Sequence, residues 1–307
     1  MKNVFEKSLA SLLLLLVSLL YLGCSKERIK EPALNQYSPV STYLDTKKQP
    51  EQEFIIDSST AGSIVGNQGT KISIGKQCLA YSNGDSVTWP FTVKLVELYK
   101  PKDMIYYQMP TVASGNILET DGEIRLRAFK NSTELILKPS PCFFQIEMPN
   151  TTPKSYMRVF YGFDSNGRPN WTDNPSSLGV TTSLSPVFST TASSYVASIA
   201  RLGWINCGVL ATNSPGSTLT FTSSTDDLTN VGIFIYLPAT KTLMQVHNVT
   251  SDLIPNDVSA TIIAIAVDAN GQLFSSTLTQ TISGSAQVDI VLGPVSDAAL
   301  TSFLDAL

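Results

Sequence analysis

Residues 87–99 read VTWPFTVKLVELY, and apolar side chains recur at every second position along them. Phe91, Val93 and Leu95 fall on one side of this alternation. A period of two residues is typical of a β-strand that buries one face. The stretch therefore predicts a strand within a sheet and favours a β-rich fold.

Turn signals divide the chain around this strand into short runs of strand-forming residues. On the N-terminal side, the run TKISI (70–74) predicts a strand, and Asn83-Gly84 predicts a tight hairpin turn because both residues tolerate positive φ. On the C-terminal side, strands are expected at 123–129, 134–137 and 143–148. We therefore expect residues 54–153 to form a β-sandwich domain.

Residues 154–207 are harder to assign than the segments around them. They contain one clear strand, 157–163, and the run SYVASIARLGWINC (194–207), which fits a single strand throughout. The pattern leaves open whether this segment is a third small domain or completes the first sheet. We treat it as a connecting β subdomain.

Residues 208–307 show strand-like runs at intervals of about 8 to 12 residues, which is typical of an immunoglobulin-like sandwich. The turn at 268–271 predicts a hairpin between two of these runs. Ser296 can cap a closing helix whose Leu300 and Leu304 lie at helical spacing. The predicted fold is all-β, with two β-sandwich domains in tandem and a short C-terminal helix.

The N-terminus has the order of a secretory leader. Lys2 and Lys7 precede the apolar run 9–22, and the small residue Gly23 comes before Cys24. The run is shorter than the roughly 20 residues that span a bilayer. Leu20 and Leu22 before Gly23-Cys24 resemble the lipobox of bacterial lipoproteins, although Tyr21 departs from its usual leucine. The resemblance implies a signal peptide at 1–23 and a lipidated, palmitate-bearing Cys24. The alternatives are an ordinary cleaved leader and an uncleaved anchor helix.

The residues after Cys24 are polar and rich in charge and proline. We expect 24–53 to be a flexible tether between the membrane and the first domain. Without residues 1–23, the chain has 19 basic and 24 acidic residues. This mild negative charge argues against a nucleic-acid partner, which usually requires a basic patch.

Three cysteines remain besides Cys24, so at most one pair can form within the chain. Cys78 and Cys142 fall in the same predicted domain and could form a disulfide. The alternative is that Cys78, Cys142 and Cys207 are all buried free thiols that pack as small apolar residues.

A family resemblance covers about half of the chain. It rests on GTKISI, on the stretch from VKLVELYKPKDM to NSTELIL, and on LGWINC. These motifs resemble a group of uncharacterised Bacteroidetes cell-envelope lipoproteins. Their first domain is similar to the β-sandwich spectrin-binding domain of ankyrins and netrin receptors. The resemblance implies an envelope location, here the outer membrane with the leaflet left open, and it implies no activity.

The sequence offers little support for an enzyme. The single histidine, His247, has no local motif around it, and none of the common nucleophile, phosphate-loop or zinc motifs is present. Paired carboxylates are harder to exclude, because the fold and not the spacing brings them together. The acids of the most family-like region are Glu97, Glu119, Asp121 and Glu123. LETDGE (118–123) reads more simply as a turn around Gly122.

One loop, DSNGRPNWTD (164–173), combines oxygen-bearing side chains with a tryptophan. Oxygen ligands on a glycine-bearing loop suit Ca²⁺, but the full calcium-loop pattern is absent and a plain hairpin turn is the alternative. We expect the tryptophan to be exposed and available to stack on a sugar. The candidate ligand or calcium residues are Asp164, Asn166, Asn170, Trp171 and Asp173.

Ser86 within Asp85-Ser86-Val87 resembles a short O-glycosylation motif of Bacteroidetes envelope proteins and lies in a predicted turn. Taken together, the sequence predicts a non-enzymatic envelope lipoprotein that acts as a binding, adhesion or architectural module. Its expected partners are the membrane, through lipidated Cys24, and an unknown protein or glycan. No catalytic residue, metal or cofactor is assigned. The alternative is a carboxylate-based envelope hydrolase or glycan-processing enzyme.

Overall fold

The computed structural model describes residues 33–57, 62–139, 141–180, 187–211 and 216–307. Within them, strands make up most of the regular structure, and three α-helices accompany the strands. The all-β class predicted from the sequence is confirmed. In the described part of the chain, no helix has the length and apolar character needed to cross a membrane.

Sheet A, the first large sheet, is built around β5 (Phe91–Leu98) and the long strand β7 (Asn116–Lys130). Strand β5 buries Phe91, Val93 and Leu95, as the alternation predicts. The strand order is β1-β5-β7-β15-β11-β12, and β6 and β8 pair with β7. The remaining members are β1 (Gln52–Ile56), β6 (Val112–Ala113), β8 (Thr133–Glu134), β11 (Arg158–Asp164), β12 (Pro169–Thr172) and β15 (Gly203–Leu210).

Sheet B faces sheet A and has the order β13-β14-β10-β3-β2. Side chains such as Leu95 and Leu126 from sheet A meet Ile72, Phe144 and Ile146 from sheet B in one apolar core. The strands of sheet B are β2 (Ser63–Val65), β3 (Lys71–Ser73), β10 (Phe144–Pro149), β13 (Phe188–Thr190) and β14 (Ser194–Ile199). A short pair, β4 (Leu79–Ala80) with β9 (Ile136–Leu137), lies beside this sandwich.

Residues 154–207 complete the first sandwich, which answers the question that the sequence left open. Strands β11 and β15 pair within sheet A, whereas β14 pairs with β10 in sheet B. The run 194–207, which the sequence allowed as one strand, is two strands in different sheets. The chain crosses between the sheets before Gly203, whose φ of 114° few other residues adopt.

Sheet C, the C-terminal sheet, has the order β19-β18-β21-β22-β24. The predicted hairpin at 268–271 joins β21 to β22. One face of the sheet packs on β17, which runs parallel to β23, and this small layer differs from the antiparallel sheet of an immunoglobulin-like sandwich. The strands are β16 (Gly216–Ser217), β17 (Leu219–Thr222), β18 (Gly232–Leu237), β19 (Thr242–Val246), β20 (Ile254–Pro255), β21 (Val258–Val267), β22 (Leu273–Ile282), β23 (Ala286–Asp289) and β24 (Gly293–Pro294).

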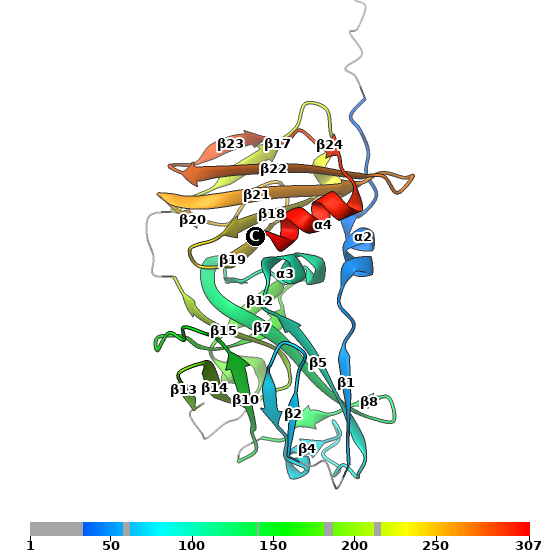
Figure 1. Ribbon diagram of the computed structural model, residues 1–307, viewed down its shortest axis with the longest axis vertical. Helices are drawn as coiled ribbons and strands as arrows, with labels where there is room; N and C mark the ends of the chain where they lie inside the picture. The colour runs from blue at the N-terminus through cyan, green and yellow to red at the C-terminus, as the bar shows by residue number, and fades with distance from the viewer. Residues whose placement is uncertain (1–32, 58–61, 140, 181–186, 212–215) are drawn as a thin grey trace, which may run out of the picture. The chain divides into compact units, whose positions relative to one another are not determined.

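Three helices fill the space between sheets A and C, as Figure 1 shows: α2 (Val40–Lys47), α3 (Pro101–Tyr107) and α4 (Asp297–Asp305). Leu98 from sheet A, Phe234 from sheet C and Leu300 from α4 belong to one apolar cluster. The closing helix α4 is the one predicted, and Ala299 N–H donates to Ser296 Oγ at its start. The two sandwiches thus share an apolar layer within one compact unit, residues 35–307.

The predicted tether at 24–53 is wrong for residues 35–53, which pack against the rest of the fold. Asp226 is buried and accepts hydrogen bonds from Tyr37 Oη (2.6 Å) and Asn35 Nδ2 (3.0 Å). Beyond them, α2 buries Leu44 completely, and β1 begins at Gln52. The sequence did not predict α2 because VSTYLDTK (40–47) has no clear apolar periodicity. The helix depends on tertiary packing instead. Residues 24–32 lie outside the described part of the chain.

Candidate functional site

Two adjoining hollows, of about 650 and 380 Å³, lie where β19, the β11–β12 turn and the start of α2 meet. Both are lined by Arg168, Gln245 and His247, so we treat them as one groove with these three residues at its centre. The larger hollow continues toward α2 and Asn230, and the smaller one continues toward Ser114 and Asp252, which are adjacent to β6 and β20. The groove is the candidate functional site.

The β11–β12 turn holds Arg168 in place. Ser165 N–H donates to Arg168 O (2.8 Å), and Arg168 N–H donates back to Ser165 O (3.2 Å). Asn166 and Gly167 occupy the two central positions with φ of 56° and 78°, which is the geometry of a tight hairpin turn. Gly167 N–H also donates to Asp164 Oδ1 (2.9 Å). The backbone of this turn is therefore fixed at the edge of the groove.

The five residues predicted as a ligand or calcium loop do not converge on one point. Asn166 and Asn170 line the smaller hollow, whereas Asp164 caps its own turn and Asp173 lies 3.6 Å from Arg158. Among the described residues, no three His, Cys, Asp or Glu side chains lie close enough together to hold a metal ion. The loop is a hairpin of which two members reach the groove.

Trp171, predicted to be exposed, is buried with 2% of its surface accessible. Its indole N–H donates to Pro110 O at 2.7 Å, and its ring packs with the apolar cluster between sheets A and C. The polar residues around it in the sequence misled because they line a turn, whereas Trp171 points inward from β12. No sugar can stack on this ring.

The charged and polar groups at the centre of the groove lack partners. Arg168, Gln245 and His247 make no side-chain hydrogen bond or ion pair with any described residue. Partial burial and the positive charge of Arg168 lower the pKa of His247, and Asp252 opposes them. At neutral pH the groove therefore offers a guanidinium, a neutral imidazole and amide side chains, with Asp227 in the larger hollow and Asp252 in the smaller, and these groups together suit a polar ligand.

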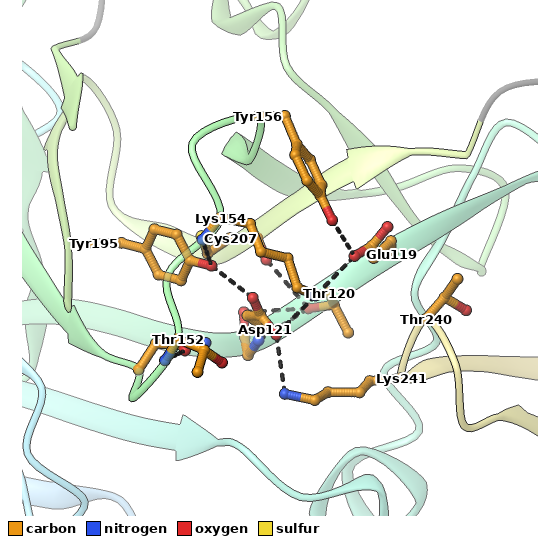
Figure 2. A network of polar contacts seen from close by, with 12 residues as sticks. Glu119, Thr120, Asp121, Thr152, Lys154, Tyr156, Tyr195, Cys207, Thr240 and Lys241 are labelled. Atoms are coloured by element: carbon orange, nitrogen blue, oxygen red, sulfur yellow. Dashed lines mark hydrogen bonds and ion pairs between the residues drawn. The ribbon is translucent and has the colours of Figure 1, made fainter. Parts of the chain in front are cut away.

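A second polar cluster surrounds Asp121 (Figure 2). The Asp121 side chain is 1% exposed and accepts from Tyr195 Oη (2.6 Å) and Lys241 Nζ (2.9 Å), with Lys154 Nζ at 3.6 Å. Lys154 also donates to Glu119 Oε1 (2.8 Å), and Tyr156 Oη donates to the same oxygen (3.1 Å). Burial opposes ionisation, but the hydrogen bonds from Tyr195 and Lys241 outweigh it and lower the pKa of Asp121.

This cluster joins the two sandwiches. Asp121 belongs to β7 of sheet A, Tyr195 to β14 of sheet B, and Lys241 to the turn before β19 of sheet C. The lowered pKa and the buried, fully bonded carboxylate suit a structural ion cluster, because a general acid needs a proton and access to a substrate. The arrangement therefore links elements and offers no open site.

Glu97 is also committed to the fold. Its fully buried carboxylate accepts from Gln52 Nε2 (2.9 Å), Gln68 N–H (2.9 Å) and Thr70 N–H (3.0 Å). The chain passes so close to this carboxylate that a Cβ at Gly66 would lie 2.5 Å from Glu97 Oε2. Glu97 thus satisfies the backbone of the segment that leads into β3.

Glu123 is the most unusual acid of the described chain. It lies opposite Asn206 across β7 and β15, with no exposed surface, and it accepts from Asn206 Nδ2 at 3.2 Å. Glu123 Oε2 and Asn206 Oδ1 are buried without a partner among the described residues. Burial raises the pKa of Glu123 well above its ordinary value, and the bond from Asn206 only partly offsets this. Burial therefore favours the protonated form of this carboxyl group.

The cysteines and Ser86 occupy distinct environments. Cys78 and Cys142 form a disulfide with a Cα–Cα distance of 5.1 Å, which confirms one of the two alternatives from the sequence. Cys207 is a buried free thiol whose pKa is raised by burial, so it is unreactive. Ser86 lies exposed beside the predicted turn at Gly84, and Cys24 lies outside the described residues.

Comparison with known proteins gave no match to a family model, a curated protein or a solved structure. The resemblance to Bacteroidetes lipoproteins therefore stays a prediction from sequence motifs. Sequence reasoning identified Asn166 and Asn170 but missed Arg168, Gln245 and Asp252 as groove residues, and it set His247 aside. Arg168 lies within the loop that the sequence singled out, whereas no local signal marks Gln245, His247 and Asp252, which the fold brings to that loop from distant segments.

Proposed function

We propose that this chain is a non-enzymatic binding protein of a bacterial envelope, held at the outer membrane by lipidated Cys24. Its polar partner occupies the groove between the β11–β12 turn and β19. The observation that carries the proposal is that Arg168, Gln245 and His247 line both hollows and that their side chains have no hydrogen-bond or ion-pair partner within the described ranges. Polar groups that converge on a concave surface without internal partners are typical of a binding site.

The acids of the protein support binding over carboxylate catalysis. Glycoside hydrolysis uses two carboxyl groups about 5 to 9 Å apart on either side of the substrate. Among the described residues the groove holds two carboxylates, Asp227 in the larger hollow and Asp252 in the smaller, and Asp227 Oδ1 already accepts from Thr229 N–H (3.0 Å) and Thr229 Oγ1 (2.6 Å). The acids that cluster in the sequence bond to the fold instead, as Glu97 and Asp121 show.

A binding assay with matched variants tests this proposal. The full chain is applied to arrays of oligosaccharides and of peptides, beside the variant R168A/H247A and the control Arg158→Ala. Arg158 is a largely exposed arginine of the same hairpin that does not line the groove. Because charge-assisted hydrogen bonds are lost, we expect the double variant to bind its array ligands about tenfold or more weakly, and the control to bind normally.

Two outcomes contradict the proposal. Binding that survives in R168A/H247A places the ligand elsewhere, and the absence of any ligand on both arrays removes the support for a binding protein. Hydrolysis of an arrayed oligosaccharide by the full chain would support the alternative, an envelope hydrolase.

A further inference from the structure

Strand β19 is an edge strand that borders the groove. It begins the order of sheet C and pairs along one side with β18. The other edge of such a strand carries backbone N–H and C=O groups that another chain can pair with. Gln245 of this strand and His247 just beyond it line both hollows. The backbone of β19 therefore forms part of the groove surface.

The contacts of Leu243 show which backbone N–H and C=O groups of β19 point away from β18. Leu243 N–H donates to Thr111 Oγ1 (2.8 Å), and Leu243 O accepts from Thr111 N–H (2.7 Å). Both groups thus point away from β18. Since backbone groups alternate in direction along an antiparallel strand, Gln245 points the same way as Leu243. Thr111 satisfies the edge at Leu243, and the groove begins at the next outward residue.

Gln245 N–H and C=O have no partner among the described residues. Two residues on, His247 O accepts from Thr250 N–H at 3.4 Å, which closes the edge with a turn. The open part of the edge is short and centred on Gln245. A donor and an acceptor on one residue, facing a groove, match the paired hydrogen bonds that an added antiparallel strand forms.

The charge of the groove favours one kind of strand. Arg168 lies at the centre beside Gln245, and its guanidinium has no ion-pair partner in the described chain. At the far side of the larger hollow, α2 begins at Val40 without a side-chain cap. Arg168 attracts a negative group at the centre of the groove, whereas Asp227 offsets the attraction of the α2 start in the larger hollow and Asp252 disfavours an anion in the smaller one. An incoming segment with an acidic side chain near Arg168 would therefore complement the groove.

We propose that the groove binds an extended peptide segment of a partner protein. The segment adds as a strand to the outer edge of β19 at Gln245 and places an acidic side chain opposite Arg168. This inference rests on the proposed binding function and specifies its partner. Main-chain hydrogen bonds supply affinity in this mode of recognition, and the alternate side chains supply specificity.

The test begins with a displayed library of dodecapeptides, from which ligands of the full chain are selected. One selected peptide is then resynthesised with a single N-methyl group at each position in turn. We expect N-methylation to weaken binding at alternate positions near the centre, because only every second N–H of an added strand faces β19. Replacing its central acid by asparagine should weaken binding about tenfold.

A pair of protein variants gives an independent readout. Gln245→Pro removes the outward N–H and leaves the bonds to β18 intact, and proline is tolerated on edge strands at such positions. Gln245→Ala removes the side chain but keeps the N–H. We expect Gln245→Pro to bind the peptide about tenfold more weakly than Gln245→Ala. The circular dichroism spectrum and melting temperature show whether each variant is folded.

The outcomes separate this inference from the proposed function. If the wild-type protein binds the peptide but N-methylation does not weaken binding at alternate positions, the strand-addition inference is overturned. This holds whatever affinity Gln245→Pro shows. If oligosaccharides bind in the groove and peptides do not, the proposed function stands and the inference falls. If neither class binds, both fall.

Discussion

At the scale of single residues, two acids show how the partners of a buried carboxyl group determine its pKa. Two lysines and Tyr195 surround Asp121 and lower its pKa, whereas Glu123 has only the amide of Asn206 and its pKa is raised by burial. Protonation of Glu123 would add a donor where Glu123 Oε2 and Asn206 Oδ1 are buried without a partner among the described residues. The two acids are two residues apart in the sequence, so their spacing could not reveal this difference.

Glu123→Gln tests the protonated state. The folded-state pKa of Glu123 is raised, so its contribution to stability is fully present below its unfolded pKa of about 4.3 and is lost as the pH rises toward the folded value. Glutamine cannot ionise and keeps a donor for Asn206. Above a pH of about 4.3, the wild type should lose up to about 1.4 kcal/mol of its free energy of unfolding per pH unit through Glu123, whereas Glu123→Gln should not. The difference between the two proteins should therefore grow with pH.

Urea unfolding at pH 4, 6 and 8 measures this difference. Glu147→Gln is the control, since Glu147 forms an exposed pair with Lys71. Parallel pH profiles for the wild type and Glu123→Gln would mean that Glu123 is ionised in the folded protein.

At the scale of elements, the sequence predicted strands and turns with local signals and missed elements that depend on distant partners. The alternation in β5 and the turn between β21 and β22 are confirmed, because one buried face or one turn suffices to specify them. Helix α2 was missed because only Val40 and Leu44 of it are buried. The groove was missed for a similar reason, since Arg168, in the turn between β11 and β12 of sheet A, is distant in the sequence from Gln245, in β19 of sheet C.

Leu44→Ala tests whether α2 is part of the fold. Leu44 is fully buried in the apolar cluster between sheets A and C, so its truncation leaves a cavity there. We expect the free energy of unfolding to fall by about 2 to 5 kcal/mol, measured by urea denaturation. The exposed neighbour Thr46→Ala is the control and should change it little. If the two variants are equally stable, residues 40–47 behave as the tether that the sequence suggested.

At the scale of the whole molecule, the first contacts of the described chain would limit the distance between the folded body and a membrane to which Cys24 is anchored. Asn35 N–H donates to Thr225 O (2.9 Å), so the C-terminal half of the protein holds the chain from residue 35 onward. From Cys24 to Asn35 a fully extended chain spans at most about 40 Å. If Cys24 carries the lipid, Thr225 and the residues around it lie within that distance of the bilayer, and a longer reach is excluded by covalent geometry.

Cys24→Ala tests the anchor on which this limit depends. Several acyl chains at one residue hold a protein stably on a bilayer, whereas none would remain in this variant. We expect wild-type cells to carry most of the protein in the membrane fraction with incorporated labelled palmitate, and Cys24→Ala to lose both the label and the membrane association. Cys207→Ala, which removes a buried thiol, is the control and should keep both. A Cys24→Ala protein that still sediments with membranes without label would place the attachment elsewhere, and the 40 Å limit would no longer follow.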